Sequence, residues 1–191
     1  MDLKPITLTG KYIRLEPPEE RHADDIALSG DTTMFTYTYG PKTWTPPDIW
    51  AYMQHYVSLD NALPFVMIDL ESEKAIGFSG LINAYFYHNR IELGSTWVNP
   101  PYQGTLVNKE SKYLMLRHAF EDQGVNRVEF KLDPRNQRSA NALRSIGAVE
   151  EGLLRDHMVL MDGTIRDSQF FSIIAAEWPQ VKQHLAEKLR Y

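Results

Sequence analysis

The chain contains no cysteine, so disulfide bonds, thiolate metal sites and a cysteine nucleophile are all excluded. No stretch approaches the roughly 18 apolar residues of a membrane-spanning helix. The first residues also lack the charged start and apolar run of a signal peptide. The six histidines show no spacing typical of zinc ligands. We therefore expect a cytoplasmic protein without a metal site and without a membrane anchor.

Acidic residues outnumber basic ones, 25 to 20. The formal net charge is −5 and the basic residues are scattered along the chain, which argues against nucleic-acid binding. The sequence has no Gly-x-Gly-x-x-Gly loop and no Walker A loop. Gly77-Phe78-Ser79-Gly80 falls short of the Gly-x-Ser-x-Gly motif of serine hydrolases. A chain of 191 residues with 43% hydrophobic content suits one globular domain over residues 1–191.

Hydrophobic periodicity and turn residues predict an α/β fold. Gly124 and Gly147 follow two expected helices, and Asp162-Gly163 predicts the turn of the last hairpin. The element order β α α β β β α β α β β α fits a mixed central sheet of about seven strands with helices on both faces. Strands are expected at 10–16, 65–68, 75–82, 90–98, 127–132, 153–160 and 166–174, and helices at 19–28, 48–59, 108–123, 136–146 and 178–190.

The most informative stretch runs from Trp97 to Asn108. A β-branched, aromatic run ends in Asn99-Pro100-Pro101, a polar turn follows, and good helix formers begin at Asn108. A strand that leads into a helix through such a turn points free backbone N–H groups at one spot, which favours a phosphate. We therefore expect the amides of Gly104 to Asn108 to anchor a phosphate, with Asn108 as both N-cap and ligand neighbour. Gln103 is expected to reach the phosphates.

A second strand-turn-helix unit follows at 133–139. Two such units in this order suggest a ligand with a pyrophosphate and a reactive end. Asn136 and Ser139 lie three residues apart at the start of the helix. This spacing suits either an N-cap with its N3 partner or two ligand-binding side chains. Asn141 and Arg144 lie further along the same helix, where they either meet the far end of the ligand or face solvent.

A series of motifs runs in order through nearly the whole chain. Each motif is weak alone, but their order is fairly specific. They are Gly10-x-Tyr12-x-Arg14-Leu15-Glu16-Pro17, Glu92-Leu93-Gly94, Asn99-Pro100-Pro101-Tyr102-Gln103, the helical run 108–121, Asn126-Arg127-Val128-Glu129-Phe130-Lys131, Asn136-x-Arg138-Ser139, Ile146-Gly147-Ala148-x-Glu150-Glu151-Gly152, Arg166-Asp167 and Glu177-Trp178-Pro179. Together they resemble the GNAT superfamily of acyl-CoA-dependent N-acyltransferases, and most of all its branch of ribosomal-protein alanine N-acetyltransferases.

The resemblance implies an enzyme that uses acetyl-CoA as co-substrate and no metal. The backbone near Trp97 and Val98 would then contact the pantetheine and the thioester oxygen, and Ser139 would be the catalytic hydroxyl near the sulfur. Asn136 would bind the cofactor through its amide, and Asn141 and Arg144 would meet the adenosine end. The expected cofactor-binding residues are Trp97, Val98, Gln103, Gly104, Thr105, Leu106, Val107, Asn108, Asn136, Asn141 and Arg144.

The chain departs from the superfamily pattern at several positions. Leu106 and Asn108 stand where the phosphate loop usually carries small residues, which let a backbone approach a pyrophosphate closely. Leu143 stands where many members carry a tyrosine acid, so the resemblance assigns the role at the sulfur to Ser139. Met158 stands near the place where the ribosomal enzymes carry a glutamate, so no base is carried over from them.

The amine acceptor must lose a proton, and Glu92 is the first candidate for a catalytic base. Strand alternation puts Glu92 on the same face as Gly94, Thr96 and Val98, where a carboxylate could take a proton through water. His157 and Asp156 are the next candidates. Two alternatives stay open: Glu92 is a plain surface residue, or the amine arrives already deprotonated.

These observations predict direct transfer of an acetyl group from acetyl-CoA to a primary amine. The acceptor would be a protein N-terminus, such as that of a ribosomal protein, or a small amine. One alternative is a non-catalytic CoA-binding or protein-interaction module on the same fold. The other is a transferase for a larger acyl group such as succinyl, which a basic residue facing the acyl pocket would favour.

Two further segments bear on partners. The segment 30–47 suits either a packed loop or a lid over a substrate, because it gathers the aromatic residues Phe35, Tyr37, Tyr39 and Trp44. An open sheet edge near Arg166 to Ile174 would invite pairing with a second copy into a homodimer.

Overall fold

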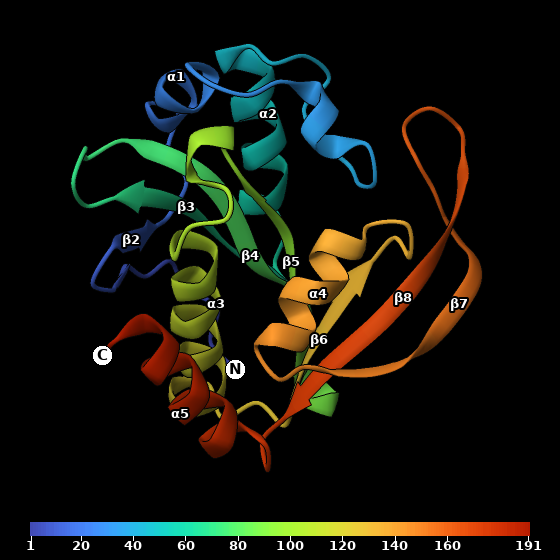
Figure 1. Ribbon diagram of the computed structural model, residues 1–191. Helices are drawn as coiled ribbons and strands as arrows, with labels where there is room; N and C mark the ends of the chain where they lie inside the picture. The colour runs from blue at the N-terminus through green and yellow to red at the C-terminus, as the bar shows by residue number, and fades with distance from the viewer.

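The computed structural model describes residues 1–191 and contains one eight-stranded sheet and five α-helices (Figure 1). The strands are β1 (Leu8–Thr9), β2 (Ile13–Glu16), β3 (Leu63–Asp69), β4 (Ala75–Tyr85), β5 (Arg90–Val98), β6 (Arg127–Leu132), β7 (Val149–Val159) and β8 (Ile165–Ile174). The helices are α1 (His22–Ala27), α2 (Pro46–Val57), α3 (Val107–Arg117), α4 (Gln137–Ser145) and α5 (Trp178–Leu189).

The sheet is mixed, as predicted. Its strand order is β1-β2-β3-β4-β5-β6-β8-β7. β5 and β6 are parallel and are connected through α3, whereas every other neighbouring pair is antiparallel. The two-residue strand β1 was not expected and accounts for the eighth strand.

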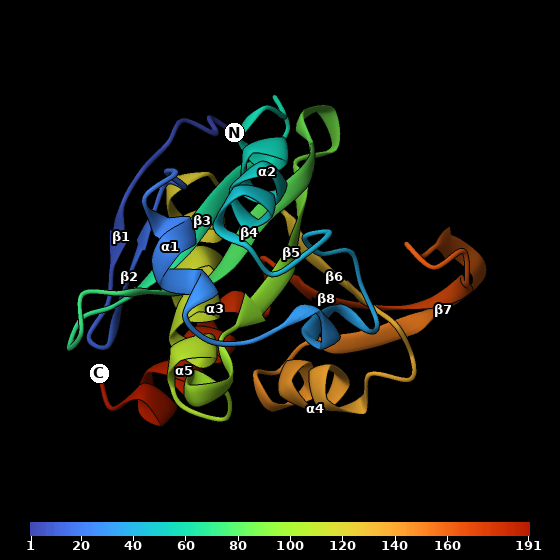
Figure 2. The ribbon, with the colours of Figure 1, turned by 90° about the horizontal axis from the view of Figure 1, so that it is seen from above.

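Helices cover both faces of the sheet, which confirms the predicted layering (Figure 2). In β3, Phe65 and Met67 belong to a large buried cluster that includes residues of α3, α4 and α5. Val66 and Ile68 belong to a smaller cluster that includes residues of α1 and α2. Because successive side chains of a strand point to opposite faces, the two clusters lie on opposite sides of the sheet.

A buried carboxylate fastens the N-terminal strands to α3. Glu110 is fully buried and accepts hydrogen bonds from three consecutive backbone N–H groups, those of Lys11, Tyr12 and Ile13, at 2.7 to 2.8 Å. The hydroxyl of Tyr191 donates to the same carboxylate. A Cβ atom on Gly10 would lie 2.5 Å from Cδ of Glu110. Gly10 is therefore required by the close approach of this carboxylate.

The expected turn glycines are confirmed. Gly124, Gly147 and Gly163 all have positive φ, at +62°, +91° and +83°. The predicted start of the central helix is wrong, because α3 begins at Val107 with Leu106 in the N-cap position and no side-chain cap. Asn108 is therefore inside the first turn and is not the N-cap.

The expected open edge near Arg166 to Ile174 is also wrong. β8 pairs with β6 on one side and with β7 on the other, so the outer strand at this end of the sheet is β7. The hairpin of β7 and β8 extends away from the helices in Figure 1. None of the five helices combines the length and the apolar character that crossing a membrane requires.

Candidate functional site

The parallel strands β5 and β6 part from one another and leave a cavity between them. They pair only over three residues of each strand, from Arg90 opposite Arg127 to Glu92 opposite Glu129. Beyond this point the cavity is lined by 93–96 of β5 and 130–132 of β6, and further by Tyr37, Thr38, Lys112, Asp133, Asn136, Ser139, Leu143 and Arg166. The divergence therefore gathers side chains from α3, α4 and β8 around the ends of two strands.

A β-bulge shapes the wall of this cavity. Phe78 and Gly80, two residues apart in β4, pair with Trp97 and Gly94, three residues apart in β5. Ser95, inside the bulge, has φ +52°. A bulge leaves backbone groups outside the regular ladder and bends the strand. Residues 94–96 line the cavity, so the bulged segment lies at the point where the two strands separate.

A second cavity lies between the start of α3 and one side of α4. It is lined by Gly104, Thr105, Asn108, Lys109, Lys112, Arg138, Ala142, Ser145 and Ile146. Three of these residues are cations and none is acidic. The backbone N–H groups at the start of α3 also have no helical partners and carry the positive end of the helix dipole. This cavity is therefore suited to a diphosphate.

Lys112 lines both cavities and so connects them. Its side chain is buried, and this burial lowers the pKa of Lys112 to about 8. The ammonium donates to the side-chain oxygen of Asn108 and forms no salt bridge. A buried cation without a counter-ion is unfavourable, and an anion bound at the junction of the two cavities would supply that counter-ion. Lys112 was not predicted from the sequence, although a lysine directly before the buried run Tyr113-Leu114-Met115-Leu116 was a usable signal.

The loop before α3 is held by its own side chains. The amide of Gln103 donates to the carbonyl of Val98 at 2.9 Å and accepts from Arg138 at 2.7 Å, which joins the end of β5 to α4. Leu106, the bulky residue at a usually small position, packs against the large core cluster. Its side chain is thereby turned inward, and Gly104 has an open surface at φ +78°.

A comparison with known protein families identifies the family to which this fold belongs. A family model described as an acetyltransferase (GNAT) domain matches residues 13–149, which is most of the chain. The chain belongs to the GNAT acetyltransferase family. The parting of β5 from β6, and the adjacent cationic cavity, are therefore features of a GNAT domain.

Solved structures show the same GNAT fold over nearly the full length. A T. thermophilus protein, provisionally described as an acetyltransferase, is 34% identical, with 99% of this chain and 100% of that chain covered and a TM-score of 0.91. Mycobacterium smegmatis RimJ in complex with CoA-disulfide is 21% identical, with 98% and 94% covered and a TM-score of 0.76. At this lower identity the likeness shows the fold alone.

Among curated proteins, the ribosomal protein uS5-alanine N-acetyltransferase of Escherichia coli (strain K12) is 25% identical over 123 residues, which is 62% of this chain. The chain spans about three fifths of the length of the curated relatives it matches, 60% to 63% of each.

Both predicted catalytic residues of the GNAT domain lie at or beside the cavity. Ser139 lines it, and its backbone N–H donates to the side-chain oxygen of Asn136 at 3.1 Å, which confirms Asn136 as the N-cap of α4. Glu92 is buried just below the point of divergence. One oxygen of its carboxylate accepts from Asn83 at 2.9 Å and from Lys131 at 3.3 Å. Lys131, in turn, lines the cavity.

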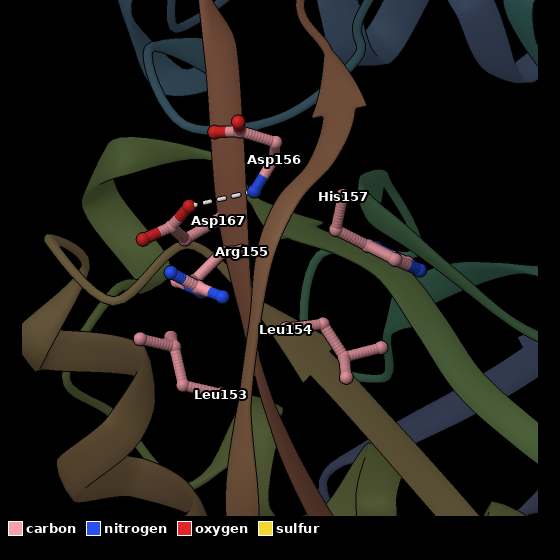
Figure 3. Close-up of a pocket in the computed structure, with 6 residues that line it drawn as sticks. All are labelled: Leu153, Leu154, Arg155, Asp156, His157 and Asp167. Carbon is pink, nitrogen blue, oxygen red and sulfur yellow. Dashed lines mark hydrogen bonds between the residues drawn. The ribbon is translucent and has the colours of Figure 1, made fainter.

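The two other candidate bases lie on the β7–β8 hairpin (Figure 3). Asp156 donates its backbone N–H to Asp167 at 2.9 Å. His157 points to the opposite side of the hairpin in Figure 3, where its ring lies 3.0 Å from the hydroxyl of Ser168. Partial burial lowers the pKa of His157, and the cations of Lys131 and Arg166 lower it further. The direction of this shift favours the neutral imidazole, the form that can accept a proton.

The remaining predicted ligands are dispersed. The side chain of Trp97 packs in the aromatic cluster with Phe35, Trp44 and Phe78, so only its backbone is directed to other contacts. Arg144 donates to Asn141 at 3.2 Å and pairs with Glu150 at 2.7 Å, outside both cavities. Phe35 and Trp44 also show that the 30–47 segment is a packed loop over part of its length. Five cavity-lining cations were not predicted: Lys109, Lys112, Lys131, Arg138 and Arg166.

Proposed function

We propose that this chain is an N-acetyltransferase that moves an acetyl group from acetyl-CoA directly to a primary amine. The observation that carries the proposal is Lys112, a buried cation shared by the cationic cavity at the start of α3 and the cavity that Ser139 lines. The family assignment and the CoA-disulfide bound by RimJ support the choice of coenzyme. The activity named for the E. coli relative supports a protein N-terminus as acceptor. We further propose that residues 1–191 act as one domain in the cytoplasm.

We assign the residues of the two cavities to different steps of the transfer. Bound acetyl-CoA supplies a thioester that is already activated for attack. Lys112, Arg138 and the amides at the start of α3 hold the diphosphate, and the bulged backbone of 94–96 orients and polarises the acyl carbonyl. The hydroxyl of Ser139 donates a hydrogen bond to the departing thiolate, because a serine of ordinary acidity stabilises such a charge more readily than it protonates it.

Proton removal from the amine is assigned to Glu92 acting through water. Asn83 and Lys131 both contact one carboxylate oxygen, Oε2, which leaves Oε1 for a water molecule. We expect Glu92→Gln to lower kcat by about tenfold or more, because the amide cannot accept the proton. His157→Gln should change kcat by less than about threefold. Steady-state rates with acetyl-CoA and an alanine-initiated peptide decide which of the two residues is the base. A larger fall in kcat for His157→Gln than for Glu92→Gln would assign the base to His157.

The Ser139→Ala variant tests the role at the sulfur. We expect kcat to fall by about tenfold while the KM for acetyl-CoA stays within about twofold, because the hydroxyl acts mainly on the leaving thiolate. Ser58→Ala, at the exposed end of α2 and outside both cavities, is the matched control for folding. An unchanged kcat in Ser139→Ala would remove the serine from the chemistry.

The overall proposal is tested with purified protein, acetyl-CoA and a panel of amines, by following free thiol. Acetyl-CoA should raise the melting temperature, since a ligand that binds only the folded state stabilises it by mass action. Thiol release that depends on the amine supports the enzyme. A melting shift without thiol release for any acceptor would instead support the non-catalytic CoA-binding module. No shift at millimolar CoA contradicts both.

A further inference from the structure

Four charged side chains line the cavity between β5 and β6: Lys112, Lys131, Asp133 and Arg166. Two of these charges are balanced inside the protein. Lys131 lies 3.3 Å from the carboxylate of Glu92, and Asp133 pairs with Arg135 at 2.7 Å. Lys112 and Arg166 are left without a carboxylate partner. Since Lys112 also lines the diphosphate cavity, the charge with no assigned counter-ion is that of Arg166.

Arg166 is 4% exposed, and all the hydrogen-bond acceptors of its guanidinium are neutral. Nε donates to the carbonyl of Asp167 at 3.2 Å, one terminal nitrogen donates to the carbonyl of Tyr37 at 2.8 Å, and the other donates to the hydroxyl of Ser168 at 3.0 Å. A guanidinium has five N–H groups, so each terminal nitrogen keeps one for another acceptor. Burial lowers the pKa of Arg166, an effect that the carboxylates of Asp133 and Glu92 oppose from a distance.

Arg166 lines the cavity between β5 and β6 and does not line the diphosphate cavity. Lys112 and the start of α3 mark the coenzyme end. Arg166 comes from β8 and contacts Tyr37, in the segment between α1 and α2 that reaches across to β8 in Figure 2. A group bound by Arg166 therefore lies beyond the thioester, where the tail of the acyl group or the acceptor must be.

We infer that the substrate carries a carboxylate, which Arg166 binds on the acceptor side of the thioester. This inference rests on the part of the proposed function that assigns acyl transfer from CoA to an amine, and it specifies the chemical class of the acyl group or of the amine. A planar guanidinium is the side chain best suited to a carboxylate, which it can hold through two parallel hydrogen bonds. The carboxylate belongs either to a dicarboxylic acyl group, as in succinyl-CoA, or to the amine acceptor.

The test compares matched pairs that differ in one carboxylate. In the donor arm, succinyl-CoA is compared with butyryl-CoA. In the acceptor arm, acetyl-CoA is used with peptides beginning Ala-Asp or Ala-Asn, and with 4-aminobutyrate or pentylamine. Each pair is measured as kcat/KM with the wild type, Arg166→Gln, Arg166→Lys and Arg155→Gln. Arg155 is an exposed arginine of the same hairpin, so its variant controls for the change in net charge (Figure 3).

We expect the wild type and Arg155→Gln to prefer the carboxylate member of one pair by about tenfold or more, and Arg166→Gln to lose this preference. The arm in which the preference appears identifies the source of the carboxylate.

Two results would overturn the inference. The first is a wild type that shows no preference in any pair, whether or not the variants fold. The second is a preference that Arg166→Gln retains. If Arg166→Gln does not fold, a weakened preference in Arg166→Lys supports it and an unchanged one overturns it. If acetyl-CoA neither shifts the melting temperature nor releases thiol with any amine, the proposed function fails and this inference with it.

Discussion

Replacing Lys112 by methionine is expected to raise the dissociation constant of acetyl-CoA by about 10- to 100-fold, because a hydrogen bond between a buried cation and a phosphate contributes about 1.5 to 3 kcal/mol. Methionine fills a similar volume without a charge. The unliganded protein should therefore keep its melting temperature or gain stability, since the substitution removes a buried ammonium that has no counter-ion. Calorimetric titration and thermal unfolding measure the two effects separately.

The pH dependence gives a second readout. Burial lowers the pKa of Lys112 to about 8, and a bound diphosphate raises it again by pairing with the ammonium. Binding therefore becomes coupled to proton uptake above pH 8, and the affinity of the wild type for acetyl-CoA falls as the pH rises from 8 to 10. Lys112→Met should show a flat profile over this range. Lys74→Met, in the exposed β3–β4 turn, should behave as the wild type. Parallel profiles in all three proteins would place the diphosphate elsewhere.

The features that could be predicted from the sequence are those whose causes are close together in the chain. Helix ends at Gly124 and Gly147 and the hairpin turn at Gly163 depend on backbone conformations that favour glycine. The strand-turn-helix unit around Gly104 is likewise contiguous. Its start was misplaced by one residue because Asn108 has the side chain of a good N-cap, while in the structure that side chain accepts from Lys112.

The features that could not be predicted depend on partners far apart in the chain. Arg166 meets Tyr37 across 129 positions, and Lys131 meets Glu92 across 39. Period-2 patterning indicates which strands exist but not their order, so β8 was taken for an edge although it lies between β6 and β7. The cations of the site were not predicted, because a cation indicates a binding site only when it lacks a carboxylate partner. Those partners lie far away in the chain and are known only from the structure.

Glu110→Ala is expected to destabilise the protein by about 4 kcal/mol, which corresponds to a fall in melting temperature of about 8 to 16 °C for a chain of this size. The substitution leaves the backbone N–H groups of Lys11, Tyr12 and Ile13 without their acceptor and removes a buried side chain. Glu71→Ala, at an exposed turn position, should leave the melting temperature within about 2 °C of the wild type. Hydrogen exchange should show faster exchange at residues 11–13 in Glu110→Ala.

The same carboxylate predicts a coupling with Gly10. An alanine there would place Cβ 2.5 Å from Cδ of Glu110, so Gly10→Ala should destabilise the wild type. In a Glu110→Ala background the obstructing carboxylate is gone, and Gly10→Ala should cost less. Contacting residues typically show such non-additivity, at about 0.5 to 3 kcal/mol. A double-mutant cycle of unfolding free energies measures it. Strict additivity, or a Glu110→Ala protein that melts like Glu71→Ala, would mean that the N-terminal strands are held by their sheet pairing and not by this buried acid.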